Sequence, residues 1–382
     1  MHGGAQMSKS KVYLTNFKTE VDVSYLDKLH NIMKEAGFEN IDFKNKFVAI
    51  KIHFGEYGNL SFIRSNYAKV VADYVKALGG KPFLTDCNTL YVGSRRNALD
   101  HMDTANLNGF SYLQTGCHVI IADGLKGTNE TNVKIEGLDV PPARIGSAIM
   151  DADIVISLNH FKGHEVVGFG GAIKNLGMGS GSRSGKMDMH SNGKPRVTKS
   201  RCIGCGACTR VFAHDAPHVT DGLCQIDKEK CVGCGRCMGV CPVDAIDADY
   251  RTSSVLLNKR IAEYALAVCQ NRPNFHINMI MDISPNCDCH AENDLPIIPN
   301  IGMAASFDPV ALDQCCIDLC KDAPVVPGSQ RDLSLKKMKA ESQVIPDDPW
   351  RQSNPVTVWE PCLEHSAEIG LGMREYEMIT IK

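Results

Sequence analysis

Short apolar runs alternate with amphipathic stretches along the first half of the chain. The run FVAIKIHFG at 47–55 predicts a strand that ends in a glycine turn, and NYAKVVADYVKALGG at 66–80 predicts an amphipathic helix that stops at two glycines. Three further apolar runs predict strands, namely KPFLTDCN at 81–88, HVIIADG at 118–124 and ADIVISLNHF at 152–161. This alternation predicts an α/β fold with a mostly parallel sheet and helices on both faces.

One short segment interrupts this pattern. The stretch 198–250 is rich in cysteine and glycine and contains two similar cysteine triplets, 29 residues apart. Beyond it, NFHINMIMDIS at 274–284 predicts a strand and DPVALDQCCIDLCKDA at 308–323 predicts a helix, so the α/β pattern resumes. We therefore expect a small unit at 198–250, inserted between the two parts of one α/β domain, 1–197 and 251–382.

Composition is that of an ordinary soluble protein. Of the 382 residues, 43% are hydrophobic and 22% are charged, and the net charge of −3 gives no reason to expect a nucleic-acid partner. No apolar run approaches the roughly 20 residues that a membrane span needs. Because the N-terminal stretch MHGGAQMSKSKVYLTNF contains no apolar signal core, a cytoplasmic protein is expected. Residues 330–360 are polar and contain several prolines, which predicts a loop-rich surface segment.

The seventeen cysteines point to metal binding. Without a secretory signal they are expected to be reduced, so clustered cysteines predict metal ligands rather than disulfides. The bacterial spacing C-x2-C-x2-C-x3-C-P wraps the backbone around an iron–sulfur cluster, and its fourth cysteine binds the other cluster of a pair. The second triplet and the cysteine that follows match this spacing in full: Cys231, Cys234, Cys237 and Cys241. Zinc is the alternative metal, but two tandem triplets and a Cys-Pro favour iron–sulfur clusters.

The first motif lacks its fourth cysteine. Its triplet consists of Cys202, Cys205 and Cys208. Phe212 stands where the fourth cysteine would be, and phenylalanine cannot bind iron. The crossed pattern assigns the first triplet and Cys241 to one complete 4Fe-4S cluster, and it leaves the cluster of the second triplet one ligand short.

Several outcomes are open for this second cluster. His214 or Cys224 acts as a substitute ligand, or the cluster is of the 3Fe-4S type, or its fourth iron is open to water or substrate. A lost second cluster is the remaining alternative. The inserted unit is thus expected to be an α+β, ferredoxin-like domain with two iron–sulfur clusters, at least one of them 4Fe-4S.

A polar segment follows the predicted strand at 152–161. The sequence NHFKGHEVVGFGGAIKN places His160, Lys162, His164 and Lys174 around a glycine-rich turn. Histidines there can bind a metal or move protons, lysines can hold a carboxylate or phosphate, and exposed backbone N–H groups favour an anion. The turn itself contributes Gly170, Gly171 and Asn175.

Polar residues also follow the earlier strands. His53 follows FVAIKI, and Asp86 and Thr89 follow KPFLT, with Arg95 close behind and His190 further along the chain. Ligands of parallel sheets bind at the carboxyl ends of the strands, so these side chains are expected to meet. The predicted catalytic residues are His53, His160, Lys162, His164 and Lys174, and the predicted cofactor-binding residues are Asp86, Thr89, Gly170, Gly171 and Asn175.

A further cysteine run, Cys287-Asp-Cys289-His290, follows the predicted strand at 274–284. Such a run can bind metal, and one of its thiols could approach the incomplete cluster. The alternative is a polar loop with unused thiols.

Five stretches carry a resemblance to a known family: KIHFGEYGN, FLTDCNTLYVGSRRNA, IIADGLKG, HFKGHEVVGFGGAIKNLGMG and the stretch that begins DPVALDQ. Together they resemble an uncharacterised family of iron–sulfur centre proteins, the domain-of-unknown-function 362 group, over nearly the whole chain. The resemblance implies an α/β domain with an inserted two-cluster ferredoxin unit. Family members usually carry both complete motifs, so Phe212 departs from the family and puts a standard pair of four-iron clusters in doubt.

A shorter stretch, His164-x3-Gly168-Phe-Gly-Gly171-x2-Lys174, is similar to H-x3-G-F-x-G-G-x2-K of the nickel-pincer lactate racemases. The histidine of that family binds nickel. The similarity implies a metal or cofactor role for His164, and it implies no racemase activity.

These features together predict an iron–sulfur oxidoreductase of anaerobic metabolism. Electrons are expected to pass between an external carrier, a ferredoxin or flavoprotein, and a small anionic substrate or cofactor in the α/β domain. Two other classes are the alternatives: a non-enzymatic electron-transfer protein that docks a redox partner, and an accessory protein that handles metals or clusters.

Overall fold

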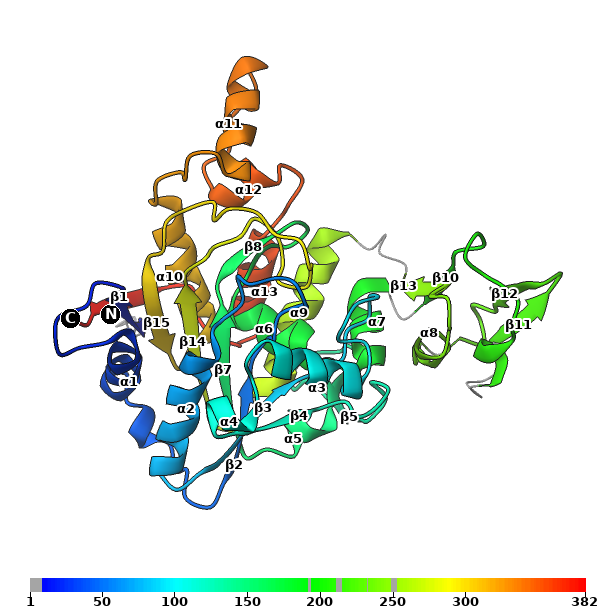
Figure 1. The fold of residues 1–382 in the computed structure, drawn as a ribbon, viewed down its shortest axis with the longest axis horizontal. Helices are drawn as coiled ribbons and strands as arrows, with labels where there is room; N and C mark the ends of the chain where they lie inside the picture. The colour runs from blue at the N-terminus through cyan, green and yellow to red at the C-terminus, as the bar shows by residue number, and fades with distance from the viewer. Residues whose placement is uncertain (1–8, 192–193, 211–214, 232, 249–252) are drawn as a thin grey trace, which may run out of the picture.

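The computed structural model describes residues 9–191, 194–210, 215–231, 233–248 and 253–382 (Figure 1). An eight-stranded sheet forms its centre, in the order β16-β1-β15-β14-β7-β2-β3-β4. These strands are β1 (Ser10–Asn16), β2 (Phe47–Lys51), β3 (Lys81–Asp86), β4 (His118–Ile121), β7 (Ile154–His160), β14 (Asn274–Ile280), β15 (Gly302–Ser306) and β16 (Tyr376–Thr380).

The sheet is mostly parallel. Strands β14, β7, β2, β3 and β4 all pair in parallel, and β16 pairs in parallel with β1. Only β15 runs against its neighbours, since it is antiparallel to both β1 and β14. The α/β prediction is confirmed, and five of the eight strands are those that the apolar runs predicted.

Two hydrophobic cores lie on the two faces of the sheet. The β2 side chains alternate, so that Val48 and Ile50 join one core and Ala49 joins the other. The first core is covered by α1 (Tyr25–Glu35) and α2 (Ser65–Ala77). The second is covered by α6 (Ala172–Ser180) and α10 (Pro309–Lys321), against which α9 (Ser254–Cys269) and α13 (Glu360–Glu368) pack.

Shorter elements connect these layers. They are η1 (Phe38–Asn40), α3 (Ala98–Leu107), α4 (Tyr112–Thr115), β5 (Glu130–Val133), β6 (Ala143–Gly146), α5 (Ser147–Met150), β8 (Lys162–His164), β9 (Gly168–Gly170) and α7 (Arg183–Ser191). Across the described ranges, every helix is too short or too polar to cross a bilayer.

The segment 330–360 contains two helices, α11 (Gln330–Ala340) and α12 (Pro349–Ser353), so the prediction of a loop-rich stretch was wrong in part. Helix α11 lacks an apolar stripe and stands away from the body (Figure 1). Its start is instead fixed by a cap, because the Ser329 side chain accepts a hydrogen bond from the N–H of Asp332. A polar helix of this kind is not visible in hydrophobic periodicity.

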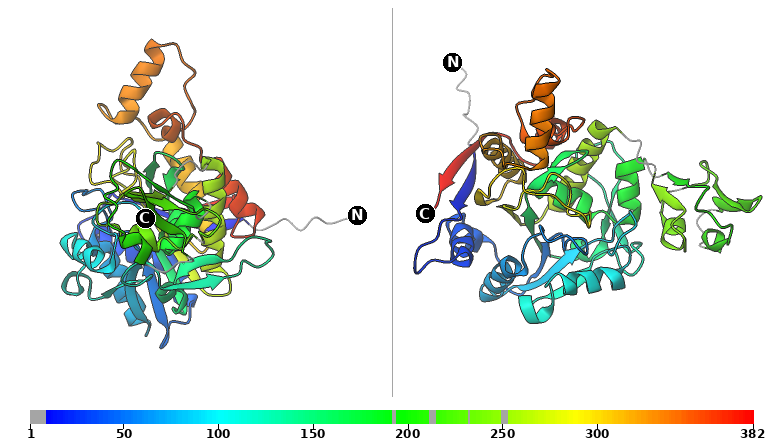
Figure 2. Two further views of the ribbon diagram at one scale, coloured as in Figure 1. Left: turned by 90° about the vertical axis from the view of Figure 1, so that its right-hand side faces the viewer. Right: turned by 45° about the horizontal axis from the view of Figure 1, so that its top comes forward.

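The cysteine-rich unit protrudes from the α/β body as a separate lobe (Figures 1 and 2). It begins at Pro195, because β10 (Pro195–Val197) pairs with β13 (Ile246–Ala248) at its far end. Between them lie η2 (Ala207–Arg210), the antiparallel pair β11 (Pro217–Thr220) and β12 (Leu223–Ile226), and α8 (Arg236–Gly239). This is a small α+β arrangement, and its ferredoxin-like character stays a prediction.

Two arginines of the body attach this unit. Arg96 donates to the backbone oxygen of Met238 at 2.5 Å and forms an ion pair with Asp244. Arg183 of α7 packs against Gly235 and Gly239, where a Cβ atom would collide with its side chain. Glycine is favoured most strongly at Gly235, which has a positive φ of 65° and faces the stem of the arginine, whereas at Gly239 only the mobile guanidinium end would have to shift.

A buried histidine in β14 gives the fold a pH dependence. His276 is fully buried, with Nδ1 at 2.9 Å from Ser157 Oγ and Nε2 at 2.8 Å from Asn274 Oδ1. Burial lowers the pKa of His276 to about 3. Because the unfolded chain takes up this proton near pH 6.5 and the folded chain does not, the stabilising contribution is present above pH 6.5 and is lost as the pH falls.

We expect His276→Gln to remove this dependence. Below pH 6.5 the stability advantage of the wild type over the variant should shrink by about 1.4 kcal/mol per pH unit. Urea unfolding of both proteins between pH 8 and 5 measures the difference, and pH 8 serves as the reference where both side chains are neutral. A constant difference over this range would contradict a neutral buried imidazole.

Candidate functional site

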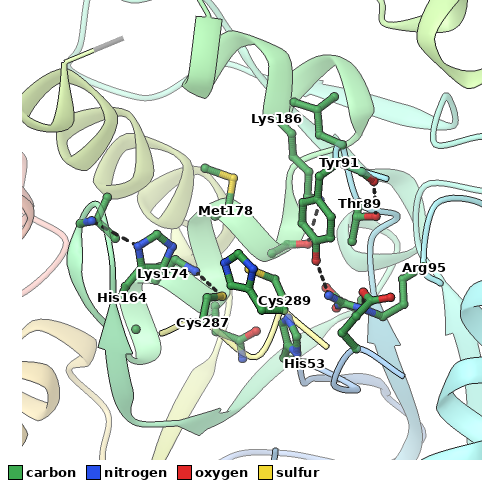
Figure 3. A pocket seen from close by; sticks show the side chains of 18 of the residues that line it. His53, Thr89, Tyr91, Arg95, His164, Lys174, Met178, Lys186, Cys287 and Cys289 are labelled. Atoms are coloured by element: carbon green, nitrogen blue, oxygen red, sulfur yellow. Dashed lines mark hydrogen bonds and ion pairs between the residues drawn. The ribbon is translucent and has the colours of Figure 1, made fainter. Parts of the chain in front are cut away.

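A cavity of about 600 Å³ lies at the carboxyl ends of β2, β3 and β7 (Figure 3). Parallel strands present these ends at one edge of the sheet, so residues that follow different strands meet there. The structure brings all ten predicted pocket residues to this cavity: His53, Asp86, Thr89, His160, Lys162, His164, Gly170, Gly171, Lys174 and Asn175. Their individual contacts differ, and these contacts determine what each side chain can do.

A buried network of charges forms one wall. Lys51 at the end of β2 is fully buried, and its Nζ lies 2.9 Å from Asp86 Oδ1 and 2.6 Å from Asn175 Oδ1. Arg95 continues the network, with Nη1 at 3.6 Å from Asp86 Oδ2 and Nε at 3.1 Å from Glu56. Burial alone would raise the pKa of Asp86, but Lys51 and the neighbouring cations lower it. Asp86 and Asn175 are thus engaged within the protein and hold the wall together.

His160 has both ring nitrogens occupied. Nδ1 lies 2.8 Å from Asp288 Oδ2, and Nε2 lies 2.7 Å from the backbone oxygen of Met281. Lys162 Nζ lies 3.3 Å from the same Asp288 oxygen. Burial would raise the pKa of Asp288, but His160 and Lys162 lower it. These contacts correct the predicted role of His160, because no ring nitrogen is left for a metal or a transferred proton; it fixes the loop that carries Asp288.

The glycine-rich turn mainly serves the fold. Asp313 of α10 accepts hydrogen bonds from the N–H groups of Ala172 and Ile173, at 2.8 and 2.9 Å, at the start of α6. A Cβ atom on Gly171 would collide with this carboxylate. Burial raises the pKa of Asp313 to about 6. The N–H groups expected to hold an anion are therefore used by Asp313, although Gly170 and Gly171 do line the cavity.

Two imidazoles of the cavity have a defined tautomer. Nδ1 of His164 accepts hydrogen bonds from the N–H groups of Val166 and Val167, at 3.1 and 3.3 Å. Nδ1 of His53 accepts one from the N–H of Gly55 at 3.0 Å. In each neutral ring the proton is therefore on Nε2. Burial, and then the neighbouring cations, hold the pKa of His53 well below its usual value.

Two lysines of the cavity are available for an anion. Lys174 Nζ lies 3.4 Å from Cys287 Sγ, and Lys186 of α7 donates to the backbone oxygen of Gly181 at 2.5 Å. Within the part of the chain that the structure describes, neither lysine forms a salt bridge with a carboxylate. His190, one turn after Lys186, also lines the cavity, and burial lowers its pKa to about 3.

The loop after β14 brings two thiols to the cavity, so Cys287 and Cys289 are not part of a remote polar loop. A hydrogen bond from the Cys289 thiol lowers the pKa of Cys287, and Lys174 and Lys162 lower it further, against the effect of burial. The run Cys-x-Cys-His directly after a strand was the sequence signal for this loop. Lys51 was missed, although a lysine inside the apolar run FVAIKIHF is itself a sign of a buried partner.

The first cysteine triplet and Cys241 lie around one small cavity of the protruding unit. Backbone N–H groups point at their sulfur atoms: Ala245 donates to Cys241 Sγ at 3.2 Å, and Cys224 donates to Cys202 Sγ at 3.3 Å. Convergent thiols with N–H donors are the surroundings that iron–sulfur clusters need. The donor set at this cavity therefore fits such a cluster.

Cys224 lies with the first triplet. Its Sγ is 3.4 Å from Cys208 Sγ, because the hairpin of β11 and β12 folds back over that triplet. Besides burial and Cys208, Cys237 of the second triplet also helps to raise the pKa of the Cys224 thiol, so the role of Cys224 as the substitute ligand of that triplet stays a prediction. His214, the other substitute ligand, and Phe212, at the position where the fourth cysteine is missing, lie outside the described residues.

The thiols of the second triplet lie close to one another and to Cys208 of the first triplet. Burial, and then the thiols of Cys234, Cys231 and Cys208, raise the pKa of Cys237 to about 12. Such mutual influence requires the three thiols to lie close together.

The pocket and the cysteine-rich unit share a wall. Leu90 lines the large cavity and also packs in one apolar cluster with Cys208, Cys224 and Cys237. Met187 of α7 belongs to the same cluster, next in sequence to the cavity residue Lys186. The apolar cluster of the unit is therefore continuous with the wall of the cavity.

A sequence model described as "Domain of unknown function (DUF362)" matches residues 48–318. No curated protein matches the chain by sequence. The lactate racemase apoprotein from Thermoanaerobacterium thermosaccharolyticum is similar in structure with 10% identity and a TM-score of 0.40, over 97% of this chain and 82% of that one. A protein from Thermotoga maritima shows 12% identity and a TM-score of 0.38, over 79% of this chain and 60% of that one.

Proposed function

The chain belongs to the DUF362 family, and we propose that it is an iron–sulfur oxidoreductase of anaerobic metabolism. In this proposal the cysteine-rich unit is a ferredoxin-like domain with two iron–sulfur clusters, which exchange electrons with an external ferredoxin or flavoprotein. The large cavity holds a small anionic substrate or cofactor that gains or loses those electrons.

The shared wall is the observation that carries this proposal. Leu90 lines the cavity and belongs to the same apolar cluster as Cys208, Cys224 and Cys237, so a cluster bound in the unit would lie near the wall of the cavity. Electron transfer needs such proximity and no covalent link. A plain electron carrier has no use for a 600 Å³ cavity beside its cysteines.

The cavity chemistry suits an anionic substrate. Lys174 and Lys186 supply positive charge, and among the described residues neither forms a salt bridge with a carboxylate. Nδ1 of His164 accepts backbone hydrogen bonds, so Nε2 carries the ring proton and can donate a hydrogen bond to an oxygen atom of the substrate. In the proposal the lysines bind the substrate, and the Nε2–H of His164 stabilises the negative charge that develops on the substrate during reduction.

The protruding unit suits docking of a carrier. Cys205 is exposed, and Ile203 beside it is 63% exposed. A surface of this kind also favours the second candidate, a non-enzymatic electron-transfer protein. The two candidates differ in what the cavity contributes.

Anaerobic isolation with iron and sulfide analysis and EPR tests the clusters, and His164→Ala tests the cavity. Reduction of the clusters by dithionite should be unchanged in His164→Ala, whereas turnover of a small carboxylic acid with reduced methyl viologen as donor should fall about 100-fold or more. His118→Ala, an exposed site on β4, is the matched control. Colourless wild-type protein that contains zinc would refute the proposal, and turnover with no carboxylic acid would favour the carrier.

A further inference from the structure

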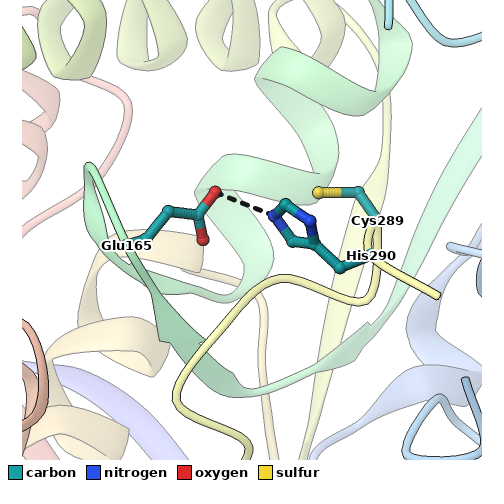
Figure 4. A group of neighbouring side chains, drawn as sticks. All are labelled: Glu165, Cys289 and His290. Atoms are coloured by element: carbon teal, nitrogen blue, oxygen red, sulfur yellow. Dashed lines mark hydrogen bonds and ion pairs between the residues drawn. The ribbon is translucent and has the colours of Figure 1, made fainter. Parts of the chain in front are cut away.

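Three different donor atoms converge at one point of the cavity wall (Figure 4). A carboxylate oxygen of Glu165, Sγ of Cys289 and a ring nitrogen of His290 all lie within 4.8 Å of one another. All three residues line the large cavity. They come from the turn between β8 and β9 and from the loop after β14, more than 120 positions apart in the chain.

The surrounding protein holds these donors in place. Glu165 accepts a hydrogen bond from the N–H of Cys287 at 3.4 Å, which joins the two segments. Asp288, between the two cysteines, is fully buried against His160 and Lys162. Two further hydrogen bonds fix the same loop. The backbone oxygen of Asp288 accepts one from the N–H of Glu56 at 3.0 Å, and the backbone oxygen of His290 accepts one from Asn59 Nδ2 at 3.0 Å. Preorganised donors with such support are what a metal site requires.

We propose that Glu165, Cys289 and His290 bind a divalent transition-metal ion of the zinc class. One sulfur, one nitrogen and one oxygen donor form a mixed set that suits borderline ions such as Zn²⁺, Co²⁺ or Fe²⁺. Magnesium and calcium prefer oxygen donors throughout, so the thiol and the imidazole select against them. The hydrogen bond between Glu165 and His290, at 3.3 Å, would be replaced by bonds from both side chains to the ion.

Three protein ligands leave a fourth tetrahedral position open, the pattern of catalytic rather than structural zinc sites. Because the donors line the cavity, this position faces the space that His164 and Lys174 also line. The ion would be a Lewis acid for an oxygen atom of an anionic ligand. The site is separate from the two triplets and does not depend on their clusters.

Cobalt is the probe for this site. Anaerobically isolated holoprotein is treated with a chelator and titrated with Co²⁺, and the difference spectrum reports thiolate-to-cobalt charge transfer and tetrahedral d–d bands. We expect about one Co²⁺ per chain in the wild type. Removing a residue that only supports a metal ligand usually lowers the affinity for the metal by about 10–100-fold. Removal of a ligand itself, in Cys289→Ser or His290→Ala, should therefore weaken Co²⁺ binding by more than about 100-fold.

His365 provides a matched control. Its Nε2 lies 3.3 Å from Glu263 and its Nδ1 lies 3.2 Å from Glu368, much as His290 lies between Glu165 and Glu292, but no cysteine is part of that group. His365→Ala should leave Co²⁺ binding unchanged. The proposal is overturned if the wild type shows no charge-transfer band. It is also overturned if the band remains in Cys289→Ser but disappears in Cys231→Ser, because the cobalt would then be bound by the second triplet. Iron and sulfide counts on the same samples report separately on the clusters.

Discussion

Replacing Cys241 by serine is expected to remove a whole cluster, a loss of about four iron and four sulfide per chain. Cys241 is the one cysteine outside the first triplet that the crossed pattern assigns to the complete 4Fe-4S cluster, and it lines the same small cavity as that triplet. Its sulfur accepts the N–H of Ala245, a contact that would tune a bound cluster. Iron and sulfide analysis and EPR of the reduced protein measure the loss, and carrier-dependent electron uptake should fall with it.

Cys362→Ala is the control for this variant. Cys362 is a buried core cysteine of α13 that lines neither the large cavity nor the small cavity of the unit. Cys224→Ser makes a second comparison, since Cys224 lies against Cys208 in the first group. Unchanged iron and sulfide in Cys241→Ser would contradict the crossed assignment. A loss confined to Cys231→Ser would assign the only cluster to the second triplet.

Lys51→Met is expected to reduce the free energy of unfolding by about 3–5 kcal/mol, the usual cost of removing one partner from a buried ion pair. Lys51 is fully buried and bonds to both Asp86 and Asn175. Without it, the Asp86 carboxylate keeps the hydrogen bond from the N–H of Cys87 at 2.9 Å, but its remaining contacts with cationic side chains are the longer ones to Arg95 and His101, at 3.6 and 3.9 Å. Urea unfolding at pH 7 measures the loss.

Lys46→Met is the matched control. Lys46 precedes the same strand, and its ion pair with Asp153 is 3.8 Å long with side chains 45% and 41% exposed. An exposed pair of this kind contributes less than about 1 kcal/mol. Adding Asp86→Asn to Lys51→Met should restore part of the lost stability, because it removes the uncompensated charge. If Lys46→Met and Lys51→Met lowered the free energy of unfolding equally, the burial of the Lys51–Asp86 pair would not explain the loss of stability.

The fold followed from local pattern to a large extent. Five apolar runs became strands β2, β3, β4, β7 and β14 of the central sheet, because a short continuous run of apolar side chains is a property of each segment alone. The pocket residues followed from the same reasoning, since polar residues after parallel strands meet at one edge. Helix α11 did not, because a capped polar helix carries no hydrophobic period.

The sequence by itself determined the strands, the polar residues that follow them and the spacing of the cysteines. Only the tertiary structure decided their partners. In the folded protein both ring nitrogens of His160 are hydrogen-bonded, and Asp313 accepts the hydrogen bonds from the N–H groups that follow the glycine turn. Cys289 and His290 lie beside Glu165. The reason is that β14 lies next to β7 in the sheet although about 114 residues separate them, and hydrophobic periodicity carries no information on such pairing across the chain.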